Sequence, residues 1–485
     1  MTKDIRALEP TELWNNFADL NAVPRGSKKE ERVIQFMVDF GKKLNLDTVV
    51  DLVGNVIIKK PASKGMENRK TVVLQSHLDM VHQKNSDTNF NFDTEGIKML
   101  VDGDWVRADG TTLGADNGIG VAAIMSVLAS KTIKHPAIEA LFTIDEETGM
   151  TGAMGLQANY LNGEILLNLD TEEDDEIDIG CAGGIDVTAQ NTYNEVGAPV
   201  NSGGYTIAIT GLKGGHSGMD IHKGLGNANK IMNRVLYESK EFIRISEING
   251  GSLRNAIPRE SFAIISVADS RKEAFIKKIN KTVKEIKSEF AAVDPNLNIK
   301  ISEVATPERV MTTISQSTLL NVIYAAHNGV YRMSNDMEDL VETSNNVARV
   351  IVKDESVKVM CLTRSSVESA KFDMANTLKA TFEMAGYDVT FSGSYPGWKP
   401  NVNSPILKLL TETYEKLFSE KPSVVACHAG LECGILGTNY PNMDMISFGP
   451  TIQGAHSPDE KANIKSAQKF WKYLLTILEN IPIKK

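Results

Sequence analysis

The sequence predicts an α/β protein in which a doubly wound mixed sheet is interrupted by an inserted α+β domain. In residues 1–185, short apolar runs typical of buried strands alternate with apolar stretches of helical length, as in a largely parallel sheet. In residues 186–396 the pattern changes to strands and long amphipathic helices. Strand-like and helical stretches similar to those of residues 1–185 return in residues 397–485. The middle domain is therefore expected to be an insertion.

Apolar spacing and turn residues place the main elements of the first segment. Apolar side chains at helical spacing predict helices between Pro10 and Leu46. Two short strands are expected around the turn Val53–Asn55, followed by a buried strand at Thr71–Gln75, a hairpin near Asp102–Trp105 and a buried helix at Gly118–Leu128.

The inserted domain has its own pattern. Strands are expected at Tyr205–Thr210, Ser261–Val267 and Val357–Leu362, and amphipathic helices at Lys272–Phe290 and Ala370–Met384. The Pro- and Gly-rich segment Ser394–Pro400 is a good boundary for the return to the first domain. Helices at Ser404–Phe418 and Ser466–Leu478 would complete that domain.

The composition is that of an ordinary globular protein, with 42% apolar and 24% charged residues among 485. The net charge of −10, without a cluster of Lys and Arg, argues against nucleic acid, and no apolar run reaches the length of a membrane span. Four cysteines without a CxxC pair form no disulfide framework, and the N-terminus lacks a secretory pattern. We therefore expect a cytoplasmic protein that acts on small polar molecules.

Histidine and carboxylate side chains occur where several predicted strands end. The residues are His77 and Asp79 after the strand Thr71–Gln75, Asp116 before the buried helix, and Glu146, Glu147 and Asp170 after two further apolar strands. In open α/β sheets, functional groups gather beyond the carboxyl ends of the strands. Imidazole and carboxylate ligands suit zinc, cobalt or manganese. The pattern predicts a two-metal hydrolase, in which metal ions polarise a carbonyl and activate water while a carboxylate transfers protons.

A late histidine would complete this set of ligands, and two positions qualify. His428 and His456 both lie in Gly-rich loops that follow apolar runs, and composition does not choose between them. The acidic run Glu172–Glu176 is interpreted as solvated surface without a role. His82 and His222 lie close to motif residues, and a structural role is expected for both.

The order and spacing of these motifs resemble a known family. The motifs are His77-Leu-Asp79, Gly-Ala-Asp116-Asn, Glu146-Glu147-Thr-Gly, Asp170 and Ala-His456-Ser-Pro. They resemble those of the co-catalytic zinc metallopeptidases that include carnosinases, aminoacylases and glutamate-releasing carboxypeptidases. Longer stretches, Arg107–Gly120, Gly214–Gly218, Leu253–Glu260 and His428–Gly434 among them, extend the resemblance over essentially the whole chain, toward dipeptidases that act on Xaa-His substrates.

The resemblance implies a cofactor of two divalent metal ions, expected to be Zn²⁺ with Co²⁺ or Mn²⁺ as alternatives. Asp116 would bridge both ions. His77 and Asp170 would complete one metal site, and Glu147 and His456 would complete the other.

Three further features come from the same resemblance. Glu146 would be the general base that takes a proton from the metal-activated water and returns it to the leaving amine. Asp79 would hydrogen-bond the second ring nitrogen of His77 and fix its tautomer. A cis peptide bond is expected at Asp116–Asn117, although a non-proline cis bond costs ~3 kcal/mol.

The insert at residues 186–396 resembles the family's lid, which implies substrate-binding roles and a homodimer formed through this domain. His216 would stabilise the tetrahedral oxyanion, an interaction worth ~3 kcal/mol. Asn255 and Arg364 are candidates for binding the C-terminal carboxylate of the substrate. Glu432, from the third segment, would meet the free amino group.

The implied function is metal-dependent hydrolysis of small peptides, namely dipeptides with a free N-terminus, of the Xaa-His type and with broad specificity. The alternatives are a deacylase (aminoacylase) or a tripeptidase of the same family. A metal-binding scaffold without catalysis is a third alternative, and the presence of Glu146 argues against it, because metal storage needs no base.

Overall fold

The computed structural model describes residues 4–484, and the chain divides into two compact units. Unit 1 consists of Met1–Gly180, Pro400–Ala426 and Leu431–Lys485, and unit 2 of Cys181–Lys399 and Cys427–Gly430. The sequence-based limits, 185/186 and 396/397, lie a few residues from the two main limits of these units.

Within the described residues, unit 1 is built on an eight-stranded mixed sheet. Its strands in spatial order are β1 (Asp47–Val50), β2 (Val56–Lys60), β6 (Ile138–Thr143), β3 (Val72–His77), β7 (Ile165–Asn168), β23 (Asp444–Ser447), β8 (Glu176–Cys181) and β22 (Ser423–Cys427). The central pairs β6–β3, β3–β7 and β7–β23 are parallel. The pairs β1–β2, β2–β6 and β23–β8 are antiparallel. The predicted mixed α/β sheet is therefore confirmed.

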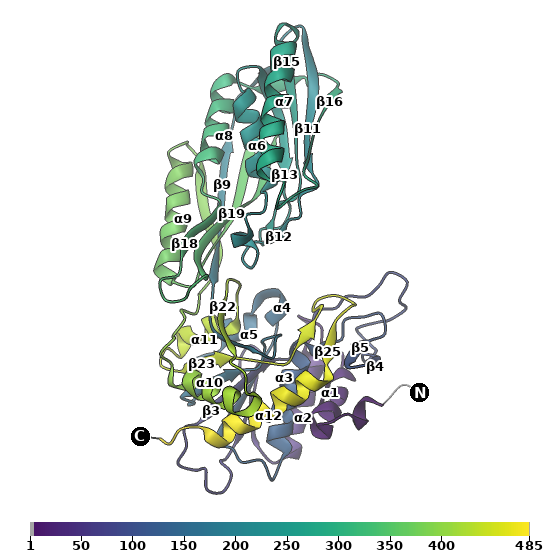
Figure 1. Cartoon of the computed structure of the whole chain (residues 1–485), viewed down its shortest axis with the longest axis vertical. Coiled ribbons are helices and arrows are strands. Elements are labelled where there is room, and N and C mark those ends of the chain that lie inside the picture. Colours follow the sequence, from purple (N-terminus) through teal and green to yellow (C-terminus); the bar gives the residue numbers. More distant parts are fainter. Residues whose placement is uncertain (1–3, 485) are drawn as a thin grey trace. The chain divides into compact units, whose positions relative to one another are not determined.

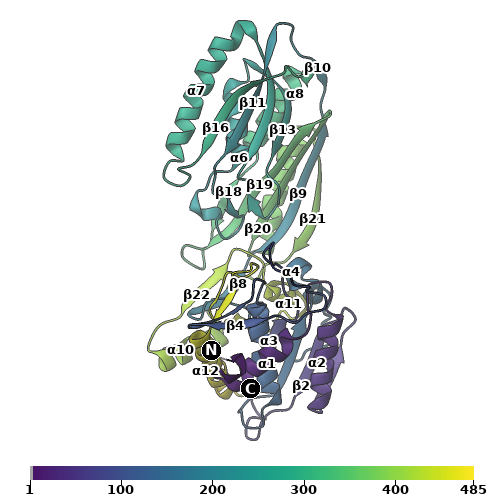
Figure 2. The same cartoon turned by 90° about the vertical axis from the view of Figure 1, so that its right-hand side faces the viewer.

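The central strands are buried because helices cover the sheet (Figures 1 and 2). Every residue of β3, β6 and β7 is buried, as expected for parallel strands covered on both faces. Helix α2 (Glu31–Lys43) packs on β1 and β2, and α3 (Ala115–Ala129) packs between β3 and α1 (Thr11–Asn21). Helix α10 (Pro405–Phe418) packs on β23 and on α12 (Ile464–Asn480).

A small second sheet in unit 1 joins the beginning and the end of the chain. It contains β24 (Ile452–Gln453), β25 (Lys461–Asn463), β5 (Trp105–Ala108) and β4 (Met99–Asp102), in that order. Strands β4 and β5 form the predicted hairpin, and β25 pairs antiparallel with β5. Strand β25 also pairs antiparallel with β24, and these two pairings fix the ends of the loop that carries His456.

Unit 2 contains a nine-stranded antiparallel sheet among the described residues. Its main path is β16 (Asn298–Val304), β11 (Ser202–Thr210), β15 (Ser261–Ala268), β13 (Ile243–Gly250), β19 (Val341–Lys353), β20 (Ser356–Ser365), β9 (Gly183–Thr192) and β21 (Asp388–Tyr395), and β18 (Gly329–Met333) pairs with β19. The predicted strands fall within β11, β15 and β20. The predicted helices coincide, within two residues at each end, with α7 (Lys272–Glu289) and α9 (Glu368–Glu383).

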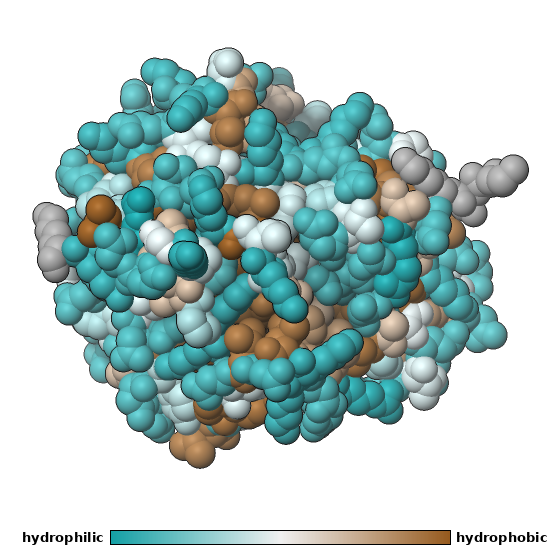
Figure 3. All heavy atoms as spheres, turned by 90° about the horizontal axis from the view of Figure 1, so that it is seen from below, coloured by the Kyte–Doolittle hydropathy of each residue, from teal (hydrophilic) through white to brown (hydrophobic). Residues whose placement is uncertain are grey.

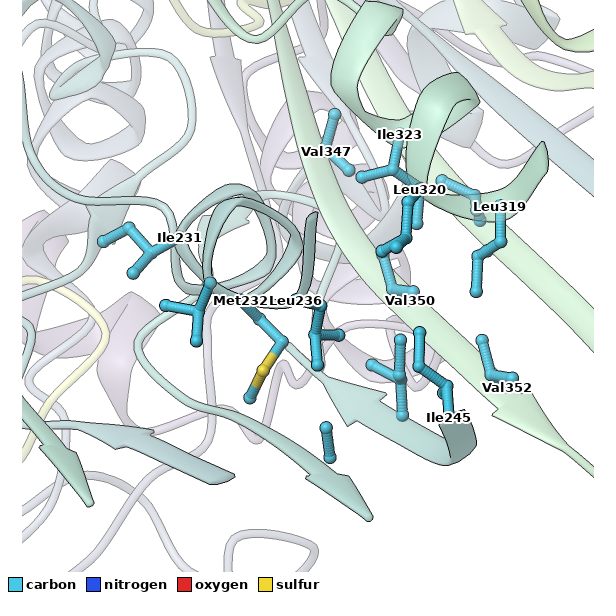
Figure 4. Packing of buried hydrophobic residues seen from close by; sticks show 14 of the residues in the cluster. Ile231, Met232, Leu236, Ile245, Leu319, Leu320, Ile323, Val347, Val350 and Val352 are labelled. Atoms are coloured by element: carbon cyan, nitrogen blue, oxygen red, sulfur yellow. The ribbon is translucent and has the colours of Figure 1, made fainter. Parts of the chain in front are cut away.

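One apolar cluster joins this sheet to its helices. Figure 4 shows Ile231, Met232 and Leu236 of α6 (Ala228–Ser239) and Leu319, Leu320 and Ile323 of α8 (Thr313–Ala325) near Ile245 of β13 and Val347, Val350 and Val352 of β19. All of these side chains are buried. Because helices and strands contribute to one cluster, the apolar side of the sheet is the side that the helices cover.

The surface is mostly polar on the face drawn in Figure 3, where hydrophobic side chains form separate groups between hydrophilic ones. No helix among the described residues combines the length and the apolar character that crossing a membrane requires.

Leu320 offers a test of this packing. Its side chain is fully buried in α8, so Leu320→Ala should lower the free energy of unfolding by about 2–5 kcal/mol through lost contacts and a cavity. Urea unfolding followed by circular dichroism measures the change. Ile314→Ala on the same helix is the control, because Ile314 is 80% exposed and its removal should change stability by about 0.5 kcal/mol or less. Equal effects of the two substitutions would contradict the packing described here.

Candidate metal centre

Six side chains of unit 1 meet beyond the carboxyl ends of its parallel strands, where open α/β sheets carry their functional groups. They are His77 at the end of β3, Asp116 in the first turn of α3, Glu146 and Glu147 in the short helix α4 (Glu146–Gly149) after β6, Asp170 just after β7, and His456 in the loop between β24 and β25. Three of these segments follow adjacent strands, so the sheet itself brings their side chains together.

Asp116 lies at the centre of the cluster. Its Oδ1 is 3.0 Å from Nε2 of His77, and its Oδ2 is 3.2 Å from Nε2 of His456. Nε2 of His77 is 3.5 Å from Oδ1 of Asp170, and Nε2 of His456 is 2.8 Å from Oε2 of Glu147. The site therefore consists of two halves that share one carboxylate.

The choice between the two late histidines follows from this geometry. His456 lies in the cluster, whereas His428 belongs to unit 2, where its Nε2 is 2.8 Å from Oγ of Ser344. The sequence could not separate them, because the difference comes from the pairing of β25 with β5.

The donor set fits divalent cations. Three groups have donor atoms within 4.8 Å of one another: His77, Asp116 and Asp170; His77, Glu146 and Glu147; and Asp116, Glu147 and His456. Oε1 of Glu147 and Oδ1 of Asp170 are buried without a hydrogen-bond partner among the described residues. An unpaired buried carboxylate oxygen is costly, and a cation would compensate for it.

The electrostatics of the cluster favour positive charge. Hydrogen bonds with Asp116 and Glu147 raise the pKa of His456 to about 11. Burial would raise the pKa of Asp116, but hydrogen bonds from His456 and His77 lower it below its usual range. Burial raises the pKa of Glu146 well above its usual range, and neighbouring carboxylates add to the effect.

The carboxylate of Asp79 lies beside Nδ1 of His77, where the sequence predicts it, and it also holds the backbone of helix α4. Its backbone oxygen is the nearer acceptor for Nδ1 of His77, at 3.1 Å, whereas its carboxylate is 3.5 Å away. The carboxylate accepts hydrogen bonds from the backbone amides of Glu146 (3.0 Å) and Glu147 (3.3 Å) and from Oγ of Ser27 (2.8 Å). With Nδ1 directed at this carbonyl, Nε2 of His77 is the ring nitrogen that faces Asp116. Asp79 thus orients the ring of His77 and holds the backbone of helix α4.

Two local expectations have clear outcomes. The peptide bond Asp116–Asn117 is cis, as predicted. The interpretation of Glu172–Glu176 as solvated surface is wrong for Glu172, Asp174 and Glu176, which are partly buried. Burial and the nearby carboxylates of Asp116 and Asp170 raise the pKa of Glu172 to about 8. Glu173 and Asp175 are exposed, as expected.

Glu432 lies in the first turn of α11 (Glu432–Asn439) and is buried in unit 1. Its Oε2 accepts hydrogen bonds from Nε2 of Gln75 (2.6 Å) and Oγ1 of Thr143 (2.7 Å). Its Oε1 has no hydrogen-bond partner among the residues that the structure describes. Burial raises the pKa of Glu432 to about 7. Sequence reasoning missed Gln75, whose only visible signal is a polar residue inside an apolar strand two positions before His77.

The predicted residues of unit 2 form a separate group. His216 lies on β12 (Gly215–His216), where it pairs with Ala256, the residue after Asn255. Nη2 of Arg364 is 3.4 Å from Nε2 of His216, and Nη1 donates to Oη of Tyr395 at 2.8 Å. Unit 2 therefore brings His216, Asn255 and Arg364 to one place.

The hydrogen bonds of His216 define its tautomer. Nδ1 accepts from the backbone amides of Met219 (3.0 Å) and Gly218 (3.3 Å), so the proton of the neutral ring lies on Nε2. Burial and the neighbouring guanidinium of Arg364 lower the pKa of His216 to about 4. Nε2–H and Arg364 thus present two hydrogen-bond donors side by side, an arrangement suited to an anionic oxygen.

Known proteins resemble the chain over its whole length. The profile of Peptidase family M20/M25/M40 matches residues 73–480. The cytosol non-specific dipeptidase of Escherichia coli (strain K12) is 44% identical over 483 residues, which cover 99% of this chain and 100% of that protein. The crystal structure of aminoacylhistidine dipeptidase from Vibrio alginolyticus is 45% identical, with a TM-score of 0.93 and coverage of 100% of this chain and 99% of that one. Aminopeptidase PepT from Bacillus cereus shares the fold, with a TM-score of 0.58 at 16% identity over 98% of this chain and 99% of that one.

The tautomer of His216 can be measured directly. Because its pKa is lowered to about 4, below the ordinary value of about 6.5, His216 should stay neutral between about pH 5 and about pH 8 and carry its proton on Nε2. Nitrogen NMR of the protein labelled on histidine would show this, and His216→Gln assigns the signal. A ring that titrates near its ordinary pKa, or that is protonated on Nδ1, would contradict the contacts described above.

Proposed function

The chain belongs to Peptidase family M20/M25/M40, and on that basis we propose that it is a metal-dependent dipeptidase which hydrolyses dipeptides with a free N-terminus, Xaa-His dipeptides among them. The observation that carries this proposal is the contact of His77 and His456 with the two oxygens of Asp116. The identity of 44% with a cytosol non-specific dipeptidase, over the full length of both chains, supports small peptides as substrates.

We assign two divalent ions, Zn²⁺ in the first place and Co²⁺ or Mn²⁺ as alternatives, to the two halves of the site. His77 and Asp170 would hold one ion, Glu147 and His456 would hold the other, and Asp116 would be shared by both. When bound, such ions polarise the scissile carbonyl and lower the pKa of water.

Glu146 is the general base in this proposal. It adjoins Glu147 in α4, and its backbone amide is held by the carboxylate of Asp79 at 3.0 Å. Its raised pKa suits a group that first accepts a proton from the attacking water and then returns it to the leaving amine.

The residues of unit 2 bind the reacting and terminal oxygens of the substrate. The neutral ring of His216 stabilises the oxyanion by donating a hydrogen bond from Nε2–H. Arg364 and Asn255 bind the C-terminal carboxylate, for which the planar guanidinium offers two parallel donors.

Glu432 recognises the free amino group. The hydrogen bonds from Gln75 and Thr143 fix one of its oxygens and leave Oε1 for the ligand. A buried carboxylate oxygen of this kind favours an ammonium group over a neutral acyl group, because only the ammonium supplies both charge and donors.

Location and assembly complete the proposal. The chain acts in the cytoplasm, which the name of the Escherichia coli relative supports. It forms a homodimer through residues 186–396, where β16 and β21 end the large sheet and offer edges for pairing with a second copy.

Metal removal and a substrate panel test the proposed function. Chelation should abolish the hydrolysis of dipeptides, and Zn²⁺, Co²⁺ or Mn²⁺ should restore it. Glu146→Gln should lower kcat by about 10²–10⁴-fold while metal analysis still finds both ions. The panel compares dipeptides, tripeptides and N-acyl amino acids. Full activity with chelator, or full activity of the metal-loaded Glu146→Gln variant, would refute the mechanism, and a preference for N-acyl amino acids would make the protein a deacylase.

A second substitution tests recognition of the amino group. Glu432→Gln should lower kcat/KM for free dipeptides by about 10–100-fold, because a hydrogen bond to a charged group contributes about 1.5–3 kcal/mol. Cleavage of N-acetylated dipeptides, which lack the ammonium group, should change little. Glu420→Gln is the matched control, since Glu420 is exposed on the same unit. An equal loss on both kinds of substrate would show that Glu432 does not select the amino group.

A further inference from the structure

One acidic residue outside the proposed set of ligands joins two of the loops that form the metal centre. Glu460 lies four residues after His456 and is 2% exposed. Its Oε1 accepts hydrogen bonds from the backbone amides of Ala115 (2.7 Å) and Asp116 (3.2 Å). Its Oε2 accepts from the amides of Leu113 (2.7 Å) and Gly114 (2.9 Å). Four consecutive amides thus surround one carboxylate, although they lie more than 340 positions away in the sequence.

The same turn is held from its other side by a buried cation. Arg25, which is 1% exposed, donates to the backbone oxygens of Gly114 (2.5 Å), Leu78 (3.0 Å) and Asp79 (3.1 Å). Gly114 has a φ of 69°, and a Cβ atom there would lie 2.4 Å from Nη2 of Arg25. The turn before Asp116 is therefore fixed on two sides. The carboxylate of Glu460 accepts hydrogen bonds from its amides, and the guanidinium of Arg25 donates to the carbonyl of Gly114.

The loop that carries His456 needs an anchor of this kind. His456 has a φ of 62°, in the left-handed region, which residues other than glycine adopt rarely and at a cost in free energy. Its side chain is 55% exposed, so packing alone does not hold the imidazole. Between His456 and Glu460 the backbone makes one further turn, in which the amide of Glu460 donates to the oxygen of Ser457 at 3.1 Å.

We propose that Glu460 is a positioning residue which ties the loop of His456 to the turn of Asp116 and so prepares one half of the site for its divalent cation. The inference rests on the proposed metal centre. The carboxylate acts on the metal ligands through their backbone and does not itself touch the ion. Residues that orient metal ligands in this way typically contribute 10–100-fold to metal affinity.

Glu460→Gln separates this role from simple space filling. Glutamine has nearly the same shape as glutamate, but an NH₂ group replaces one of the two carboxylate oxygens. This NH₂ group would face two backbone N–H groups and could not accept their hydrogen bonds. Glu460→Asp keeps the charge on a shorter side chain and should retain part of the contacts. Asp459→Asn is the matched control, because it removes one negative charge at the neighbouring position, where the side chain is exposed.

The readout is metal binding to the full chain, measured by calorimetry with Zn²⁺ and by the visible absorption of bound Co²⁺. We expect Glu460→Gln to weaken one of the two binding events by about 10–100-fold and to alter the spectrum of one Co²⁺. Glu460→Asp should give a smaller loss, and Asp459→Asn should match the wild type. Urea unfolding of the metal-free proteins shows that each variant is folded under the conditions of the titration.

The outcomes distinguish this inference from the proposed function. A wild-type protein that binds no divalent metal would refute the metal centre itself. If the wild type binds two ions and Glu460→Gln binds both with unchanged affinity and spectrum, the positioning role is wrong. An equal loss in Asp459→Asn would also overturn it, because the effect would then be one of charge. Should Glu460→Gln fail to fold, Glu460→Asp decides: unchanged metal affinity in that variant refutes the positioning role, and a measurable loss supports it.

Discussion

The carboxylate of Asp116 must face two imidazoles at once, and much of unit 1 is arranged around that requirement. Its oxygens lie 3.0 Å from Nε2 of His77 and 3.2 Å from Nε2 of His456, with further carboxylates close to both rings. Several acids in one partly buried place repel one another and lose their hydration, a cost that positive charge can offset. Two observations reflect this excess of negative charge: the raised pKa of His456, and the oxygens of Glu147 and Asp170 that have no hydrogen bond within the described part of the chain.

Two acids beside the cluster, Asp79 and Glu460, are satisfied in another way, by backbone amides. Asp79 accepts the amides of Glu146 and Glu147, and Glu460 accepts four amides of the turn that leads to Asp116. An amide has no net charge, so these contacts stabilise a carboxylate without neutralising the ligands beside it. They also fix the backbone that carries those ligands. Asp79 and Glu460 therefore support the candidate metal centre without placing positive charge beside its ligands.

Much of this architecture was predictable from the sequence, because its elements leave local patterns. The strand that delivers His77, the hairpin around Val53–Asn55 and the buried helix after Asp116 follow from apolar periodicity and turn residues. The contacts of Glu460 and Gln75 leave no such pattern, since they join segments remote in sequence and, for Glu460, reach backbone atoms that every residue has. The partial burial of Glu172 was not predictable for the same reason, because a run of acidic residues carries no sign of which segments pack against it.

Glu432 in unit 1 and Arg364 in unit 2 carry opposite charges, which suits the roles that the proposed function gives them. Glu432 in unit 1 has a buried oxygen without a hydrogen-bond partner among the described residues, whereas Arg364 in unit 2 contacts the neutral groups of Tyr395 and His216. If the acid and the arginine were neighbours within one unit, they would neutralise each other and recognise neither end of a substrate. A neutral His216 beside Arg364 avoids a second positive charge there and leaves a hydrogen-bond donor on Nε2. Under the proposed function, the ammonium group of a free dipeptide would compensate the buried carboxylate of Glu432, whereas an N-acylated substrate would leave it uncompensated.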